Sequence, residues 1–173
     1  MLKSDTHHLS AAELNKILFN KGIELLARRE HSADELRKKL TTHSQKKMVA
    51  QDVTELILSV VVKLQDLGYQ SDERFTQAYC RSRLRKGYGR ARIVMELNHK
   101  GIAKPMIEMI LSEVSQLELA PDDVILRSWQ KKFRVLANTP KEHAKQYRFL
   151  QYRGFSGDQI TALFSHLQNK LAE

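Results

Sequence analysis

The side chains best suited to chemistry in this sequence are cations, and they concentrate between residues 81 and 104. Only Glu96 opposes them in that stretch, which contains Arg81, Arg83, Arg85, Lys86, Arg90, Arg92, Lys100 and Lys104. Arg81 and Arg85 are one helical turn apart and, with Arg74, predict a basic ridge on one helix. Cations at this density repel one another unless an anion lies beside them, so the ridge indicates binding of a polyanion. A solvated surface without a partner is the plain alternative.

The turn after this ridge gives a second reason to expect an anion there. Gly87-Tyr88-Gly89 allows a sharp bend, and a helix beginning near Arg90 would present free N–H groups in its first turn. A helix N-terminus carries a partial positive charge and attracts phosphates and carboxylates. The sequence therefore predicts an anion site where the ridge meets this helix.

A second basic group lies near the C-terminus and contains aromatic residues. Its cations are Lys131, Lys132, Arg134, Lys141, Lys145, Arg148 and Arg153, and the aromatics are Tyr147, Phe149, Tyr152 and Phe155. Aromatic rings among cations can stack on nucleic-acid bases, with core packing as the alternative. Phe155 is expected in the core because it shares a repeat position with Ile102. The residues predicted to bind the anionic partner, a filament or DNA, are Arg74, Arg81, Arg83, Arg85, Lys86, Arg90, Arg92, Lys100, Lys145, Arg148 and Arg153.

Catalytic and metal-binding patterns are missing from the sequence. It contains no HExxH, no CxxC and no GxxxxGK[ST] motif, and Gly87-Tyr88-Gly89 lacks the third glycine of a dinucleotide-binding turn. The histidines are scattered. We therefore expect no catalytic residues, no cofactor and no metal site, and we do not expect an enzyme.

The elements that position the cations are helices arranged in repeats. The pattern Leu97, Gly101, Ile102, Ile107, Ile110, Leu111 recurs with identical offsets as Leu150, Gly154, Phe155, Ile160, Leu163, Phe164. A looser copy runs from Leu40 to Ile57 if three residues are inserted after Ser44. Each unit predicts helix, tight turn, helix, with glycine where a helix ends. Such units stack on one another, because none buries its apolar face alone.

Local patterns place the individual helices. Capping boxes begin at Ser10, Ser32 and Thr139, and an apolar stripe from Val53 to Leu67 ends at Gly68. The polar residues Thr41 to Lys47 predict a loop.

The remaining patterns complete the expected fold. In the helix after Ser71, one face is expected to contain Phe75, Ala78, Tyr79 and Ser82. Gln116 to Asp123 predicts a linker, and a helix is expected from Val124 to Leu136. The expected fold is all-α, an elongated array of three tandem three-helix repeats at residues 10–70, 71–116 and 122–171.

The composition agrees with a basic binding protein in a reducing compartment. The chain has 173 residues, a net charge of +9 and an isoelectric point near 9.7. This charge favours nucleic acid, a membrane surface or an acidic protein as partner. Cys80 is the one cysteine and cannot form an internal disulfide, which predicts a reducing compartment and therefore a cytoplasmic location. Cys80 and Trp129 are both expected to be buried. No segment approaches the ~20 apolar residues that span a bilayer, and Met1 to Ser10 lacks the apolar stretch of a signal peptide.

Several ordered motifs resemble the RecX family of recombinase regulators. The similar segments span about residues 15 to 168 and are Leu25–Ser32, Glu35–Leu40, Gly68–Phe75, Arg81–Gly89, Glu96–Leu97, Lys100–Ile102 and Arg153–Ser156. Members of this family are described as three tandem three-helix repeats. The resemblance therefore implies the same fold here.

The resemblance also implies a function. Members bind the RecA recombinase, mainly as its filament on single-stranded DNA, and suppress ATP hydrolysis, strand exchange and coprotease activity in DNA repair, DNA recombination and the SOS response. They are proposed to lodge in the filament groove or to block filament growth, and some bind DNA directly. We expect a monomeric, non-enzymatic RecA modulator in which the Arg81–Arg92 ridge carries much of the binding. Single-stranded or double-stranded DNA is a possible second partner, and no membrane contact is expected.

Three other functions stay open from the residues alone. A helical module that binds nucleic acid directly would use the same basic faces, and a steep salt dependence with bare DNA would identify it. A pure scaffold with incidental charge is a second alternative. A hydrolase or transferase is the third, and the missing catalytic patterns argue against it.

Overall fold

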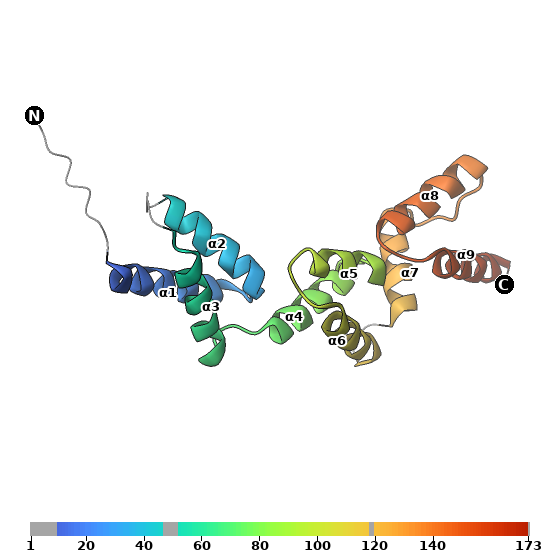
Figure 1. Cartoon of the computed structure of the whole chain (residues 1–173). Coiled ribbons are helices and arrows are strands. Elements are labelled where there is room, and N and C mark those ends of the chain that lie inside the picture. Colours follow the sequence, from blue (N-terminus) through green and yellow to red (C-terminus); the bar gives the residue numbers. More distant parts are fainter. Residues whose placement is uncertain (1–9, 47–51, 118–119, 173) are drawn as a thin grey trace, which may run out of the picture. The chain divides into compact units, whose positions relative to one another are not determined.

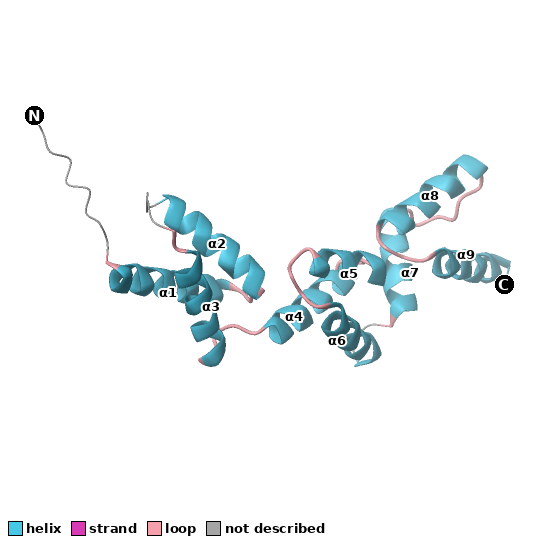
Figure 2. Ribbon diagram, in the orientation of Figure 1, coloured by secondary structure: helices cyan, strands magenta, loops and turns pink. Residues whose placement is uncertain are grey.

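The protein folds into helices joined by short connections (Figure 1, Figure 2). The computed structural model describes residues 10–46, 52–117 and 120–172, and these residues form helices and no strand. The helices are α1 (Ala11–Arg28), α2 (Ala33–Lys46), α3 (Thr54–Asp66), α4 (Asp72–Arg85), α5 (Arg90–Asn98), α6 (Lys104–Leu117), α7 (Pro121–Lys132), α8 (Pro140–Tyr152) and α9 (Gly157–Ala172). The all-α class predicted from the sequence is confirmed.

The first compact unit, Met1–Phe75, is built from α1, α2 and α3 packed against one another. Gly22 lies where α1 contacts α3, because a Cβ atom at this position would lie 2.5 Å from Cδ1 of Leu64. The apolar stripes of the three helices form one core of Leu18, Leu36, Leu40, Ile57, Val60, Val61 and Leu64. Burial of these faces stabilises helices that are too short to persist alone.

The predicted helix ends of this unit are largely observed. Ser10 and Glu13 form a reciprocal capping box before α1, and Ser32 Oγ accepts a hydrogen bond from Glu35 N at the start of α2 (3.0 Å). Gly68 follows α3 with φ +73°, the conformation that favours glycine after a helix. Leu67 is 55% exposed, so the buried stripe of α3 ends one turn earlier than predicted.

The loop predicted from Thr41 to Lys47 is wrong for its described residues, because α2 continues to Lys46. The hydroxyl groups of Thr41 and Thr42 donate to the carbonyls of Arg37 and Lys38 one turn earlier. Ser44 is buried. These polar residues therefore extend α2, and Ser44 lies on its buried face. Ser44 therefore does not end a helix as Gly101 does, and Lys47 lies outside the described residues.

The second compact unit, Thr76–Glu173, contains both clear copies of the repeat pattern. Gly101 and Gly154 follow their helices with φ +79° and +93°. In each copy the residue after the glycine donates its N–H back to a buried leucine, from Ile102 to Leu97 and from Phe155 to Leu150, both at 3.2 Å. The repeat in the sequence is thus a repeat of the same helix end, with both leucines in the core.

The end of α6 and the extent of α7 differ from the sequence expectation. Gln116 and Leu117 belong to α6, and α7 begins at Pro121, so helices occupy most of the predicted linker; residues 118 and 119 lie outside the described residues. The helix α7 ends at Lys132 rather than near Leu136. Arg134 has φ +61°, a left-handed conformation that is incompatible with continuing a right-handed helix.

Trp129 lies in the core of the second unit, as predicted. Its side chain is 4% exposed, and its indole N–H donates to Oε1 of Gln146 on α8 (2.9 Å). Nε2 of Gln146 donates in turn to the carbonyl of Val135 (2.9 Å). The buried polar groups of α7 and α8 thereby satisfy each other and hold the connection between these helices.

Cys80 is expected to react slowly with thiol reagents. It is fully buried in α4, and burial raises the pKa of its thiol from 9.0 to about 11, against a smaller opposing effect of Arg90. This shift lowers the thiolate fraction by about 100-fold at neutral pH. Release of the chromophore from Ellman's reagent at pH 8 should be slow for the folded chain and fast in urea. Equal rates in both solvents would contradict the buried assignment.

Candidate anion-binding surface

Glu96 organises several of the cations that the sequence singled out. The Tyr79 hydroxyl donates to Oε2 of Glu96 (2.9 Å) and accepts from Nη2 of Arg83 (2.8 Å). Arg92 donates from Nε to Oε1 of Glu96 (2.8 Å), and Nε of Arg83 lies 2.8 Å from Oε2 of Glu96. The Glu96 side chain is only 15% exposed. One half-buried carboxylate therefore balances two of the predicted anion-binding arginines and joins α4 to α5.

The electrostatics of this cluster favour a charged Glu96. Burial by itself would raise the pKa of the Glu96 carboxyl, but hydrogen bonds from Arg92 and Tyr79 and the charge of Arg83 lower it below its ordinary value. Burial raises the pKa of the Tyr79 hydroxyl, so tyrosine stays a neutral donor. The cluster is a structural ion network at neutral pH, and its arginines are held in place rather than free to follow a ligand.

Aromatic rings lie against cations of α4, of α5 and of the residue that follows α8. The guanidinium of Arg83 lies 5.1 Å from the ring centre of Tyr88, and that of Arg153 lies 4.8 Å from the same ring. Arg92 stacks on Tyr152 at 5.2 Å. These contacts are attractive cation–π interactions and reduce the repulsion within the basic group. Tyr152 is 70% exposed, so its ring is accessible to a partner.

Two glycines bring α5 and α8 into direct backbone contact. Gly89 N donates to the carbonyl of Arg153 (2.8 Å), and Ala91 N donates to the carbonyl of Gly154 (3.2 Å). A Cβ atom on Gly89 would lie 2.4 Å from the Gly154 oxygen. The prediction that these N–H groups are free for an anion is therefore wrong, because they already cap the C-terminal carbonyls of α8.

The buried face of α4 differs from the predicted one. Phe75, Thr76, Cys80 and Leu84 are buried, whereas Ala78 and Ser82 are exposed. Thr76, Cys80 and Leu84 are spaced four residues apart, so they lie on one face of the helix. Tyr79 is half-buried at the border of this face, where it meets Arg83.

Two predicted cations are paired with acids elsewhere. Arg74 belongs to the first unit, where Nε donates to Glu30 (2.9 Å) and Nη2 donates to the carbonyls of Gly68 and Tyr69. These bonds cap the end of α3. Arg90 pairs with Glu108 of α6.

The other predicted cations differ in how far they are exposed. Lys86, Lys145 and Arg148 are exposed, and Arg85 is exposed near the end of α4. Arg81 and Lys100 are half-buried, and the Lys100 ammonium lies 5.4 Å from the Tyr79 ring. Within the predicted set, Arg83 and Arg92 thus pair with Glu96. An exposed group lies at the end of α4 and along α8: Arg85, Lys86, Lys145 and Arg148.

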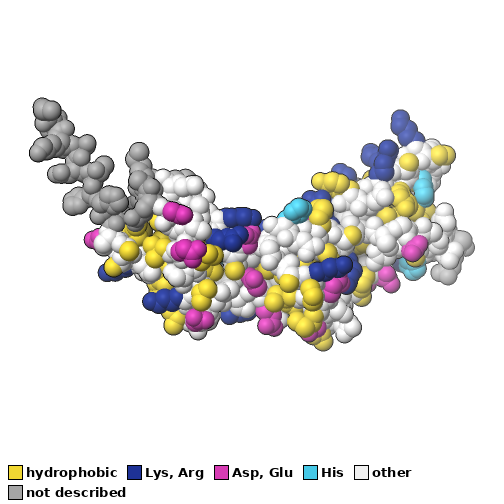
Figure 3. All heavy atoms as spheres, in the orientation of Figure 1, with side chains coloured by type: hydrophobic (Ala, Val, Ile, Leu, Met, Phe, Trp, Pro, Cys, Tyr) yellow, Lys and Arg dark blue, Asp and Glu magenta, His cyan; other side chains and the backbone are white. Residues whose placement is uncertain are grey.

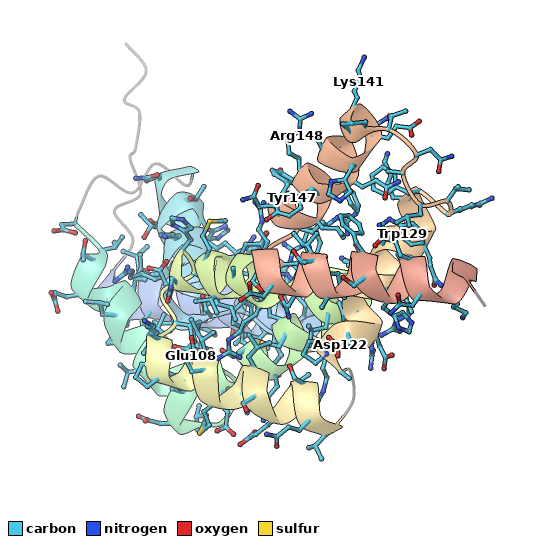
Figure 4. All side chains as sticks on the ribbon, turned by 90° about the vertical axis from the view of Figure 1, so that its right-hand side faces the viewer. Glu108, Asp122, Trp129, Lys141, Tyr147 and Arg148 are labelled. Carbon is cyan, nitrogen blue, oxygen red and sulfur yellow. The ribbon has the colours of Figure 1, made fainter. Side chains whose placement is uncertain are left out.

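The helix α8 carries part of the exposed group. Lys141 and Arg148 point from α8 away from α9, whereas Trp129 lies on α7 beneath α8 (Figure 4). Dark blue side chains stand out along the same helix in the space-filling view (Figure 3). Phe155 is buried as expected, and Phe149 packs edge-on against Phe133 with ring centres 5.2 Å apart. Of the interleaved aromatics, only Phe155 is buried among the described residues, Phe149 and Tyr147 are half-buried, and Tyr152 is exposed.

A basic groove lies beside the end of α4. It has a volume of about 370 Å³, and its lining cations come from α4, the turn after it, α7 and the residue that follows α8: Arg85, Lys86, Arg127, Lys131, Lys132 and Arg153. The site prediction omitted the α7 residues of this set, although Arg127 and Lys131 are one turn apart and share a helix face. Their proximity to Arg85 and Arg153 is a tertiary feature. In the described part of the chain, no cluster of three or more His, Cys, Asp or Glu side chains is placed to bind a metal.

Comparison with known proteins identifies the family. The family model described as RecX, second three-helix domain, matches residues 71–111, and the model described as RecX, third three-helix domain, matches residues 122–164. Regulatory protein RecX of Legionella pneumophila (strain Corby) is 38% identical over 152 residues, which cover 87% of this chain and 95% of that protein. The chain belongs to the RecX family of regulatory proteins. Regulatory protein RecX of Vibrio vulnificus (strain CMCP6) is 40% identical over 141 residues, covering 80% of this chain and 84% of that protein.

Solved RecX structures share the fold. The crystal structure of RecX from Lactobacillus salivarius matches with a TM-score of 0.67 at 19% identity, over 91% of this chain and 98% of that one. A second crystal structure of regulatory protein RecX also has a TM-score of 0.67, at 17% identity, over 88% of this chain and 72% of that one. The RecX resemblance and the helical-repeat fold predicted from the sequence are both confirmed. None of the described helices is long and apolar enough to cross a membrane.

Proposed function

We propose that this chain regulates a RecA-type recombinase by binding the recombinase filament on single-stranded DNA. Membership of the RecX family carries this proposal, because the relatives are named regulatory proteins and cover most of the chain. Exposed cations at the end of α4 and along α8 support it, since a nucleoprotein filament presents anionic surface. The protein acts as a monomer in the cytoplasm and has no catalytic step of its own.

The mechanism is inhibition through several weak contacts. Helical units at residues 10–70, 71–116 and 122–171 would contact adjacent protomers in the filament groove. Linked contacts act together through a high effective concentration, so modest individual affinities suffice. A protein that bridges protomers restrains the protomer motions on which ATP hydrolysis, strand exchange and coprotease activity depend. A protein bound at the filament end blocks filament extension.

Burial and ion pairing divide the cations that are proposed to contact the filament. Arg83 and Arg92 are engaged by Glu96, so they support the surface. Arg85, Lys86, Lys145 and Arg148 are exposed and are proposed as the direct contacts. Reversing the charge of Arg92 would disrupt the Glu96 network as well as any contact with the filament. Arg81 and Arg85 are therefore the residues chosen to test the ridge.

Substoichiometric inhibition of the recombinase ATPase is the expected result. The rate of ATP hydrolysis on single-stranded DNA should already fall at molar ratios well below one molecule of this protein per recombinase protomer. The reason is that one bound molecule restrains several protomers. The double variant Arg81→Glu and Arg85→Glu should need about tenfold more protein for the same inhibition. The matched control is Lys16→Glu with Lys104→Glu, two exposed lysines on α1 and α6. An unchanged rate with the wild-type chain at equimolar protein would contradict the proposed function.

Direct binding of nucleic acid is the second candidate function. The basic groove beside α4 favours it, because α4, α7 and the residues just after α4 and α8 place cations around one hollow and no acidic side chain is among the described residues that line it. Tight, strongly salt-dependent binding to bare DNA without any effect on the recombinase would select this alternative.

A further inference from the structure

The basic groove beside α4 contains a buried hydroxyl group without a protein partner. Ser128 is 6% exposed and lines the groove, and its Oγ has no hydrogen-bond partner among the described residues. Gly87 covers it closely, because a Cβ atom on Gly87 would lie 3.0 Å from the Ser128 Cβ. Buried polar groups are normally paired, so this hydroxyl indicates a ligand that completes its hydrogen bonding.

Arg153 is held in place at one wall of the groove. Its Nη1 donates to the carbonyls of Lys86 (2.7 Å) and Gly87 (3.4 Å), and its guanidinium stacks on Tyr88 and Phe149. The last carbonyls of a helix carry partial negative charge that repels an anion. Arg153 neutralises that charge at the end of α4, which makes the groove suitable for an anion.

Three exposed lysines line another part of the groove. Lys131 and Lys132 lie in the last turn of α7, and Lys86 follows α4; all three are exposed. Among the described residues, none of these three lysines forms an ion pair with an acid. Lysine ammonium groups bind phosphate oxygens as point charges.

We propose that this groove binds the phosphate backbone of single-stranded DNA, with Lys86, Lys131 and Lys132 around the phosphates and Ser128 donating to a phosphate oxygen. This site deepens the proposed function, because it names the groove through which the chain would contact the DNA of the filament. Only the role of the groove at a filament rests on the proposed function. A sugar-phosphate chain carries a charge at every nucleotide, so it can engage neighbouring cations from α7 and from the turn after α4. An acidic protein segment is the competing occupant, and the experiment separates the two.

The test measures fluorescence anisotropy of a labelled oligothymidine of about 40 nucleotides with the full chain between about 50 and 200 mM salt. The groove variant is Lys86→Gln, Lys131→Gln and Lys132→Gln. The control variant removes the same charge from exposed lysines elsewhere: Lys16→Gln, Lys104→Gln and Lys170→Gln. We expect the groove variant to bind about tenfold more weakly and its salt slope to fall by about 2, since each single-strand phosphate contact contributes about 0.7. The control variant should bind like the wild type.

Ser128→Ala provides an independent readout. We expect its DNA affinity to fall about fivefold, the effect of one hydrogen bond, with no loss of thermal stability because the hydroxyl has no protein partner. Unchanged affinity would overturn the assignment of Ser128 as a donor.

Three results would overturn the phosphate site. In the first, the groove and control variants weaken equally, which makes the charge non-specific. In the second, the groove variant keeps its DNA affinity and loses only thermal stability, which makes Lys131 and Lys132 complements of the α7 dipole. In the third, it keeps its DNA affinity and loses binding to the preformed filament, which identifies an acidic protein segment as the occupant. The ATPase assay is read separately, so groove-dependent DNA binding without ATPase inhibition would reject the proposed function and retain the site.

Discussion

Replacing Gly154 with alanine is expected to lower the free energy of unfolding by about 3 kcal/mol, from about 1–2 kcal/mol of left-handed backbone strain and about 1–3 kcal/mol of overpacking. Gly154 has φ +93°, and a Cβ atom there would lie 2.5 Å from the backbone nitrogen of Arg92. Neither the backbone of α5 nor that of α8 can withdraw easily, because Ala91 N donates to the Gly154 carbonyl. The substitution therefore strains the residue and separates two helices.

Gly68→Ala is the matched control for this effect. Gly68 has φ +73°, but nothing lies within 4 Å of the position of its Cβ atom. It should lose only the strain contribution, about 1 kcal/mol. Urea unfolding followed by circular dichroism measures both variants. Equal losses would show that the close approach of α5 and α8 contributes nothing beyond the backbone conformation.

Replacing Glu96 with glutamine is the second large effect, with an expected loss of about 2 kcal/mol of unfolding free energy. Removing one member of a buried ion network costs about 3–5 kcal/mol, and partial exposure of the two arginines, 26% for Arg83 and 29% for Arg92, reduces this. The glutamine leaves two guanidinium groups facing each other without a counter-charge. Glu24→Gln is the control, since Glu24 also pairs with two cations, Lys21 and Arg28, but is exposed; its loss should be small.

The Glu96 contribution should also depend on pH in a defined direction. Because the pKa of Glu96 is lowered in the folded chain from the ordinary value of 4.5, its charged form stabilises the fold above the unfolded-state pKa. This stabilisation is lost as the pH falls through the folded pKa. The stability difference between wild type and Glu96→Gln should therefore be full at pH 7 and shrink below about pH 4.5. A difference that stays constant down to pH 3 would show that the charge is not responsible.

Much of the helical architecture was predictable because its causes are local. The matched patterns ending at Gly101 and Gly154 reappear as the same helix end, with positive φ at both glycines and a buried leucine accepting the following N–H. Helix caps at Ser10 and Thr139 depend on residues three positions apart, and such short spacings are visible in the sequence. The family resemblance was visible for the same reason, since it rests on short ordered motifs.

Local patterns failed where polar residues take structural roles. Thr41 and Thr42 extend α2 because their hydroxyls bond to the preceding turn, although such residues usually favour loops. The exposed Ala78 and the half-buried Tyr79 of α4 show that apolar composition did not decide which face packs. The packing partners of a helix determine its buried face, and those partners are distant in the sequence.

The sequence by itself determined that this chain is a basic, all-helical repeat protein of the RecX family, because helix periodicity, glycine stops and ordered motifs are properties of neighbouring residues. Only the tertiary structure decided what each cation does. Arg83 meets Glu96 through the packing of α4 on α5, and Arg153 reaches the carbonyl of Lys86, 67 residues away. Whether a charged side chain is paired, stacked or open to a ligand depends on such contacts, and charge density along a chain carries no information about them.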